Sequence, residues 1–321
     1  MKLTVDCALN NQWLELQDNI ALSYLLSKAK VTQVNTPLEA LICEQLGLPT
    51  PSENQPDYPI AAIAAEADGL GVSDAYWLRA DAVHLVLQRD CFSLGEPVPL
   101  SVESAHIEQM IASMNQHFAQ DGLTFLIGKS GACYIRSTQS LQIKTTLPSV
   151  AAGKNVHPFM PQGAASAKWL SVLNEIQMLL HEHPANQLRE AKGELAVNSL
   201  WLSGGGKILQ HTALKNDVDL IVANSPFYQG LAKYAAIQCQ RLPENLTNLL
   251  SVENLHTRLA LTDVKDSFER IVTALKNKKI KQLTLNLGFY EKSLIVEMTP
   301  LDTYKFWRRI KPISNFFSQT Y

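Results

Sequence analysis

One stretch of the sequence decides the fold class: WLSVLNEIQMLLHEHPANQLREAKGELAVNSLWLSGGGK, residues 169–207. Its first part places apolar residues at helical spacing, which predicts an amphipathic helix. Pro184 disfavours the helical conformation at His183, so we expect the helix to end there. The short apolar run Val197–Leu202 is typical of a buried strand in an α/β sheet. Ser203–Gly206 would then form a turn, because glycine permits sharp changes of backbone direction.

Strands and helices alternate along the rest of the chain after Pro161. This alternation predicts an α/β fold, with a mostly parallel sheet and flanking helices. We expect five strands, at Val197–Leu202, Val218–Val222, Arg258–Leu261, Gln282–Leu287 and Leu294–Met298. The helices expected between and after them are Phe227–Ala236, Val264–Asn277 and Leu301–Ile310.

The middle of the chain follows a different pattern. Tyr76–Gln88 is extended, and a helix with apolar residues on one face follows near Ile107–Phe118. Leu123–Ile127 and Cys133–Arg136 can pair across a glycine-containing turn. This β-α-β-β order is typical of a small α+β unit. We therefore expect an inserted α+β domain at 75–152, within an α/β core domain made of 1–74 and 153–321.

The length and the amino-acid composition limit the number of domains and the kinds of partner that we expect. A chain of 321 residues favours two structural units, and a hydrophobic content of 46% is enough for a full core. The formal net charge of −2 gives no reason to expect nucleic acid or an anionic membrane as a general partner. The sequence has no apolar run of about 18 residues and no signal-peptide pattern at its start. Five scattered cysteines, at 7, 43, 91, 133 and 239, suit reduced thiols in a cytoplasmic protein.

Three segments carry a family resemblance: WLRADAVHL at 77–85, NEIQMLLHEHP at 174–184 and VNSLWLSGGG at 197–206. They resemble the RpfE-type regulatory proteins of proteobacteria, which are phosphoglycerate-mutase-like. The order of the segments, with TPLEA at 36–40 ahead of the insertion, is more distantly similar to the archaeal-type cofactor-independent phosphoglycerate mutases. The resemblance implies the alkaline-phosphatase-like fold, a mostly parallel sheet covered by helices.

The resemblance also implies a site with two metal ions. Its ligands would be an aspartate near the amino terminus, a nucleophilic serine, and aspartate and histidine clusters near the carboxyl end. Asp6 ends an apolar stretch as expected, but Cys7 follows it where the family has glycine. The late segment 283–302 contains no histidine, and the last histidine of the chain is His256. A two-metal site needs several carboxylates and imidazoles close together.

We therefore expect no metal, no cofactor and no catalytic residues. The expected function is that of a cytoplasmic regulatory or binding protein on a catalytically degenerate scaffold, with a small anionic metabolite or a protein as partner. The alternative is a metal-dependent phosphotransferase or phosphohydrolase with a rearranged site.

A ligand site is expected in the cleft between the two domains, where open α/β sheets bind ligands beyond the carboxyl ends of their strands. Cationic side chains around exposed backbone N–H groups would favour a small anion. The residues expected there are Arg79, Arg189, Ser203, Gly204, Gly205, Gly206 and Lys207. Gly204–Lys207 does not fit the Walker pattern, because Ile208 replaces the serine or threonine.

Several of these side chains also have structural interpretations. Arg79 and Asp81 lie two apart on an extended segment, so they can pair with each other instead of binding a ligand. His183, ahead of Pro184, is expected to bond local backbone carbonyls at a helix terminus rather than a metal. For Asp6 and Cys7 a strand-end carboxylate and a buried thiol are favoured. The basic run at Lys305, Arg308, Arg309 and Lys311, which includes Phe306 and Trp307, fits either a solvated helix face or a partner-docking patch.

Overall fold

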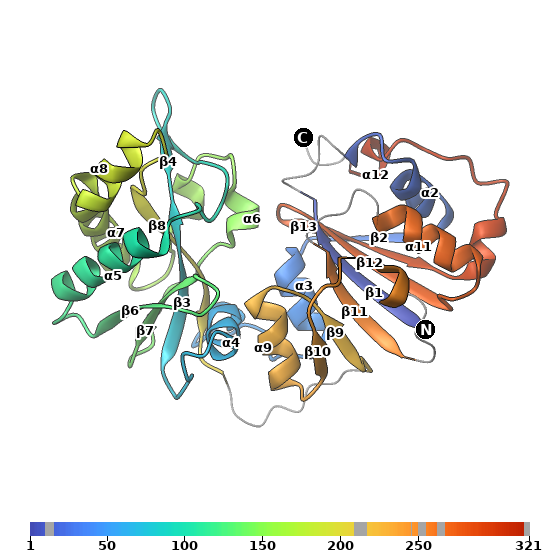
Figure 1. The fold of residues 1–321 in the computed structure, drawn as a ribbon, viewed down its shortest axis with the longest axis horizontal. Helices are drawn as coiled ribbons and strands as arrows, with labels where there is room; N and C mark the ends of the chain where they lie inside the picture. Colours follow the sequence, from blue (N-terminus) through green and yellow to red (C-terminus); the bar gives the residue numbers. More distant parts are fainter. Residues whose placement is uncertain (10–15, 209–216, 245, 250–254, 262–266, 318–321) are drawn as a thin grey trace. The chain divides into compact units, whose positions relative to one another are not determined.

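The computed structural model describes residues 1–9, 16–208, 217–244, 246–249, 255–261 and 267–317, and they form two compact units (Figure 1). The first unit combines Met1–Gly47 with Leu214–Tyr321, and the second is Leu48–Ala213. The second unit therefore extends on both sides of the expected insertion at 75–152.

The first unit is built on a seven-stranded sheet in the order β10-β9-β11-β1-β12-β13-β2. Strand β1 pairs in parallel with β11 and β12, and β9 pairs in parallel with β10 and β11. Strand β13 runs antiparallel to both of its neighbours, β12 and β2. The expected mostly parallel sheet with flanking helices is confirmed. The strand bounds are β1 Lys2–Ala8, β2 Lys30–Val34, β9 Leu220–Val222, β10 Gln238–Gln240, β11 His256–Leu261, β12 Gln282–Phe289 and β13 Lys292–Met298.

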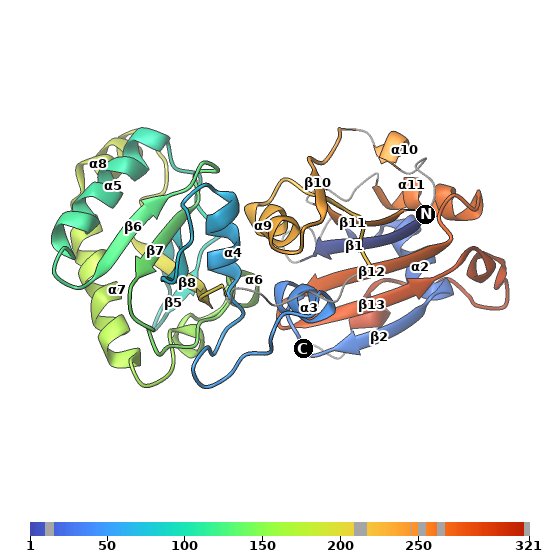
Figure 2. The same cartoon turned by 90° about the horizontal axis from the view of Figure 1, so that it is seen from below.

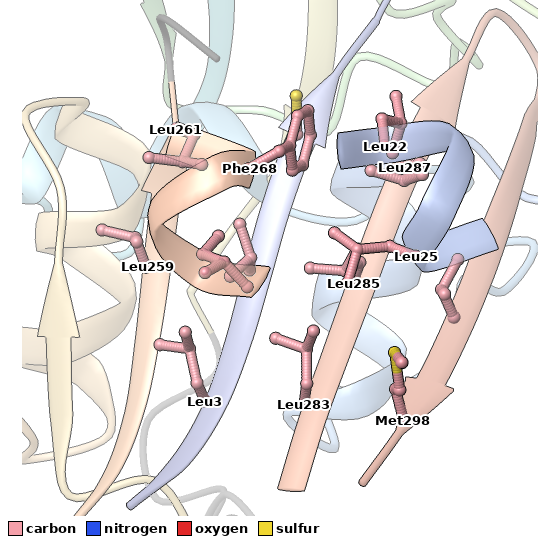
Figure 3. Close-up of a cluster of buried hydrophobic side chains, with 14 of the residues drawn as sticks. Leu3, Leu22, Leu25, Leu259, Leu261, Phe268, Leu283, Leu285, Leu287 and Met298 are labelled. Atoms are coloured by element: carbon pink, nitrogen blue, oxygen red, sulfur yellow. The ribbon is translucent and has the colours of Figure 1, made fainter. Parts of the chain in front are cut away.

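One face of this sheet carries the apolar core of the unit, shown in Figure 3. Alternate residues of adjacent strands, such as Leu3, Leu259 and Leu285, point to the same face because side chains alternate along a strand. Helices α2 (Ile20–Lys28) and α11 (Ser267–Lys276) cover it with apolar side chains. Full burial of each leucine stabilises the fold by about 1.5–3 kcal/mol.

The opposite face is covered by α3 (Leu38–Gln45) and α9 (Pro226–Tyr234) (Figure 2). At Gly288 on β12 an added Cβ would lie 2.6 Å from the Cβ of Leu38, so the absence of a side chain lets α3 approach the sheet closely. The unit also contains α10 (Leu246–Leu249), the 3₁₀ turn η3 (Pro300–Tyr304) and α12 (Ser314–Phe317).

The second unit contains an antiparallel sheet in the order β6-β7-β3-β8. Its strands are β3 Tyr76–Val83, β6 Leu123–Ile127, β7 Cys133–Ser137 and β8 Ser199–Gly206. Helices α5 (Ser104–His117) and α7 (Ser166–His181) contribute to the core on one face, while α4 (Ile60–Ala67) packs against β3 and β8. The remaining elements are β4 Leu85–Leu87, β5 Phe92–Leu94, α6 Pro148–Ala151, η2 His157–Phe159 and α8 Pro184–Ala191.

The strand at Val197–Leu202 was expected in the large parallel sheet, and this placement is wrong. It forms β8, which pairs antiparallel with β3 in the second unit. Every residue of β8 is buried, so its apolar run looks the same as that of a central parallel strand. A continuous apolar run therefore predicts that a strand is present, but it does not predict which strand pairs with it or in which direction.

The turn expected at Ser203–Gly206 is also wrong, because these residues continue β8. The glycines serve close packing instead. A Cβ added at Gly204 would lie 2.9 Å from the Cβ of Ile60 on α4, and one at Gly206 would lie 2.8 Å from the Cβ of Pro59. Helix α4 therefore rests directly on the backbone of β8.

The helix expected at Leu301–Ile310 is limited to η3, Pro300–Tyr304, which Thr299 and Asp302 cap. Helix α11 begins at Ser267, and the expected helical residues 264–266 lie outside the described residues. Among the described helices, none combines the length and the hydropathy that a transmembrane span requires.

Candidate functional site

The most polar part of the interior of the first unit lies on the sheet face beneath α3 and α9. Three neighbouring strands contribute one polar residue each: Asp6 from β1, Arg258 from β11 and Asn286 from β12. Their exposed fractions are 1%, 2% and 0%. Gln45 at the end of α3 and Tyr228 on α9 complete the group, which we call the Asp6 cluster.

Arg258 holds Asp6 through two hydrogen bonds. Its Nε donates to Oδ2 of Asp6 at 2.6 Å, and its Nη2 donates to Oδ1 at 2.9 Å. The side-chain amide of Asn286 donates to the same Oδ1 at 2.7 Å. The carbonyl oxygen of Gln45 accepts from Arg258 at 3.0 Å and from Asn286 at 2.9 Å. Paired hydrogen bonds between ionised groups are the strongest that side chains make.

The electrostatics of the cluster favour the protonated forms of Arg258 and Tyr228. Burial lowers the pKa of Arg258, but the Asp6 carboxylate outweighs burial, and the net effect is a raised pKa. Burial, and then the charge of Asp6, raise the pKa of Tyr228 well above its usual range. The guanidinium therefore stays charged, and the tyrosine stays neutral with its hydroxyl bonded to Asp6.

The residues of the Asp6 cluster do not fit a divalent metal. Both oxygens of Asp6 are occupied by N–H donors, and the position beside the carboxylate is filled by the positive charge of Arg258. The other oxygen atoms belong to the amides of Gln45 and Asn286 and to the hydroxyl of Tyr228, where a metal would prefer carboxylates or imidazoles. Within the described ranges, no three His, Cys, Asp or Glu side chains converge in a way that could hold a metal.

Cys7, next to Asp6, faces the apolar core on the other side of the sheet. Burial, with a smaller effect of Asp6, raises the pKa of its thiol to about 12. A thiol that stays protonated is a weak nucleophile. The favoured interpretation of Cys7 as a buried thiol is confirmed.

Of the residues expected to bind an anion, Arg79 and Ser203 lie opposite each other on β3 and β8. Arg79 forms an ion pair with Asp81, and its guanidinium lies 5.5 Å from the ring centre of Tyr134. Burial lowers the pKa of Arg79, but Asp81 and Tyr134 outweigh it and raise the pKa overall. Arg79 thus pairs with Asp81, as the structural interpretation of the sequence expected. The Nε–H of Arg79 is buried without a hydrogen-bond partner.

Arg189 on α8 makes its contacts elsewhere. Its Nη1 lies 3.0 Å from Oε2 of Glu194, and its Nε donates to the backbone carbonyl of Leu195 at 3.0 Å. These contacts fix the connection between α8 and β8. Arg189 is therefore engaged with this connection instead of with Arg79 and Ser203.

The backbone of the glycine run already has a carboxylate partner. Asp57 accepts a hydrogen bond from the N–H of Gly205, and it also accepts from the N–H and the hydroxyl of Thr145. Burial outweighs these hydrogen bonds and raises the pKa of Asp57 to about 6. The N–H of Lys207 donates to the side chain of Gln55 at 3.1 Å. Two of the backbone N–H groups expected to bind an external anion, those of Gly205 and Lys207, thus donate to the side chains of Asp57 and Gln55.

His183 forms the amino-terminal cap of α8, as a terminus residue should. Its Nδ1 accepts from the N–H of Ala185 at 3.2 Å, and its Nε2 lies 3.0 Å from the hydroxyl of Ser113. The position of His183 at a helix terminus is confirmed, but the prediction that it bonds local carbonyls is wrong, because its side chain caps the N-terminus of α8 and accepts from an N–H group.

Reasoning from the sequence missed the roles of Arg258, Asn286 and Gln45. One signal was present: Arg258 and Asn286 are polar residues inside otherwise apolar strands, and such residues are usually paired when buried. The pairing itself depends on the sheet register, which brings Arg258 to Asp6 across 252 positions of sequence.

Comparison with known proteins gives limited matches. No family model matches the chain. A curated protein of Geobacter sulfurreducens named "Probable 2,3-bisphosphoglycerate-independent phosphoglycerate mutase" is 30% identical over 60 residues, which span 19% of this chain and 15% of that protein.

Two solved structures are similar over most of their length. The cofactor-independent phosphoglycerate mutase from Thermoplasma acidophilum aligns over 93% of this chain and 90% of its own, with 15% identity and a TM-score of 0.40. The PH0037 protein from Pyrococcus horikoshii aligns over 93% and 87%, with 12% identity and a TM-score of 0.45.

Proposed function

We propose that this chain is a regulatory or binding protein on a phosphoglycerate-mutase-like scaffold that has lost metal-dependent catalysis. The stretch of identity with the Geobacter protein and the mostly parallel sheet support the scaffold. The RpfE type of regulatory protein is the proposed subgroup, and the cytoplasm is the proposed location.

The Asp6 cluster is the observation that carries this proposal. Asp6 stands where the family resemblance implies a metal ligand, and Arg258 supplies the positive charge beside it. A guanidinium balances the carboxylate electrostatically, but it cannot act as a Lewis acid or activate a bound water. The cluster therefore stabilises the sheet without offering the chemistry of a metal centre.

Metal analysis and an activity assay on the same purified protein test the loss of catalysis. After extensive dialysis, elemental analysis should find no stoichiometric zinc or manganese. With Mn²⁺ added, the protein should not interconvert 2- and 3-phosphoglycerate. Stoichiometric metal, or turnover abolished by Asp6→Asn but not by Lys30→Met, would instead establish the metal-dependent phosphotransferase.

A small anionic metabolite is the ligand we propose for the second unit, with Arg79, Ser203–Gly206 and Lys207 as its candidate residues, while Arg189 is engaged with the connection between α8 and β8. The buried and unpartnered Nε–H of Arg79 supports it, since this group can donate to an added acceptor. Calorimetric titration with inorganic phosphate and 3-phosphoglycerate is the test. Arg79→Gln should weaken binding by about 1.5–3 kcal/mol, the value of one charge-assisted hydrogen bond. The exposed Arg89→Gln serves as the control, and equal loss in both variants would contradict the assignment.

A further inference from the structure

The segment from η3 to Lys311 exposes an unusual number of large apolar side chains. Phe306 is 86% exposed and Trp307 is 66% exposed, and their rings contact each other at 5.2 Å between centres. Leu301, Tyr304 and Ile310 are also exposed. We call these five side chains the aromatic patch. Contiguous exposed apolar side chains of this kind mark interaction surfaces.

The backbone beneath the aromatic patch is fixed to α2 by hydrogen bonds. Lys28, the last residue of α2, is only 7% exposed and donates through Nζ to the carbonyls of Lys305 and Arg308. In return, Nη1 of Arg308 donates to the carbonyls of Lys28 and Ala29, the latter at 2.6 Å. The hydroxyl of Tyr24 donates to the carbonyl of Thr303 at 3.0 Å. These contacts hold the segment in place while its apolar side chains point away from the core.

Positive charge is concentrated around the aromatic patch. Residues 301–311 include four Lys and Arg, at positions 305, 308, 309 and 311, but only one carboxylate, that of Asp302, although the whole chain has a formal net charge of −2. Asp302 is already paired with Lys305. Lys276 at the end of α11 lies 4.9 Å from the ring centre of Tyr24, which itself bonds Thr303, so this cation adjoins the segment. The local surface is therefore cationic as well as apolar.

We propose that the aromatic patch and its surrounding cations bind the surface of an anionic lipid bilayer. Trp and Phe side chains partition into the boundary between headgroups and acyl chains, and nearby Lys and Arg interact with lipid phosphates. The cations of residues 301–311 outnumber the single carboxylate, Asp302, which is itself paired with Lys305. This excess of positive charge beside exposed Phe and Trp side chains complements the surface of an anionic bilayer.

Two contributions to binding can be measured separately. The double variant Phe306→Ser/Trp307→Ser should weaken binding to vesicles by about tenfold or more, because it removes the two aromatic side chains that we expect to enter the bilayer. The double variant Arg309→Glu/Lys311→Glu should weaken it by at least about fivefold for each cation removed, and it should also reduce the dependence on salt.

The test is flotation of the full chain with phosphatidylcholine vesicles that contain or lack phosphatidylserine. We expect binding only to the vesicles with phosphatidylserine, weakening at high salt, and a blue shift of tryptophan emission that the Trp307 variant lacks. Met178→Ser is the matched control, since Met178 is 78% exposed but lies on α7 in the other unit. Thermal unfolding of each variant verifies that it is folded.

Three outcomes would overturn the proposal: no flotation of the folded wild-type chain at low salt, equal binding to both vesicle types, or equal loss in the Phe306/Trp307 and Met178 variants. Sedimentation velocity without lipid provides a further arm. A dimer that Phe306→Ser/Trp307→Ser dissociates, together with no vesicle binding, would show that the patch binds a second copy of the chain instead.

Discussion

Replacing Arg258 by methionine tests the role assigned to the Asp6 cluster. The substitution removes two charge-assisted hydrogen bonds from Asp6 and one hydrogen bond from Gln45. It leaves the Asp6 carboxylate only 1% exposed and without its counter-charge. Breaking a buried ion pair by removing one partner costs about 3–5 kcal/mol. The free energy of unfolding of the first unit should fall by about this amount at neutral pH.

Amide hydrogen exchange measured by mass spectrometry separates the two units, because the slowest amides of β1 and β11 report unfolding of the first unit alone. The matched control is Lys30→Met. Lys30 pairs with Glu297 at 2.8 Å on the surface of the same unit, where both side chains are well exposed. Loss of such an exposed pair should cost less than about 1 kcal/mol.

A double variant distinguishes a broken ion pair from simple loss of packing. Asp6→Leu/Arg258→Met removes both charges, so it should recover a large part of the stability that Arg258→Met loses. If Arg258→Met costs no more than Lys30→Met, or if the double variant is less stable than the single one, the account of the cluster as a charge-balanced pair is refuted.

Three further predictions concern the packing of the second unit, its pH dependence and the anchoring of the aromatic patch. Gly204→Ala should destabilise the second unit by about 1–3 kcal/mol more than Gly131→Ala in thermal unfolding, since both glycines have positive φ but only at Gly204 does the added Cβ meet Ile60. Burial lowers the pKa of His183 in the folded protein, so the unfolded chain binds the proton at a higher pH than the folded chain does. The contribution of His183 to stability should therefore be fully present above pH about 6.5 and should decline as the pH falls below that value. Urea titrations should show a smaller decline in His183→Asn. Lys28→Met should speed proteolysis and amide exchange in residues 303–311, and unchanged protection there would contradict the anchoring role of its ammonium group.

The sequence predicted four strands of the large sheet, β9, β11, β12 and β13, because each carries a strong local signal, whereas the short and mostly exposed β2 and β10 do not. Gln282–Leu287 and Leu294–Met298 match β12 and β13, because alternate residues face the core and both runs are rich in branched apolar side chains. The partner of β8 was predicted wrongly because burial on both faces is independent of strand direction. Glycines in β8 were mistaken for a turn because the same residue type also serves close packing of a helix.

The candidate site could be predicted only in part. Asp6 was recognised from its place at the end of an apolar stretch, and the pairing of Arg79 with Asp81 followed from their spacing on one strand. The partner of Asp6 could not be predicted, because Arg258 meets it only through the parallel register of β1 and β11. Local pattern gives the face of a strand, while register is a property of the whole sheet.

The order of strands in the large sheet has a consequence for synthesis of the chain on the ribosome. Among the described strands, β1 pairs with β11 and β12, and these begin at His256 and Gln282. At translation rates of about 5–20 residues per second, β1 therefore waits on the order of tens of seconds for a partner. The residues of the second unit, Leu48–Ala213, all emerge during this interval and can fold first. Until then the backbone of β1 and its apolar side chains Leu3, Val5 and Cys7 lack their partners, and an unpaired strand of this kind is prone to aggregation unless a chaperone protects it.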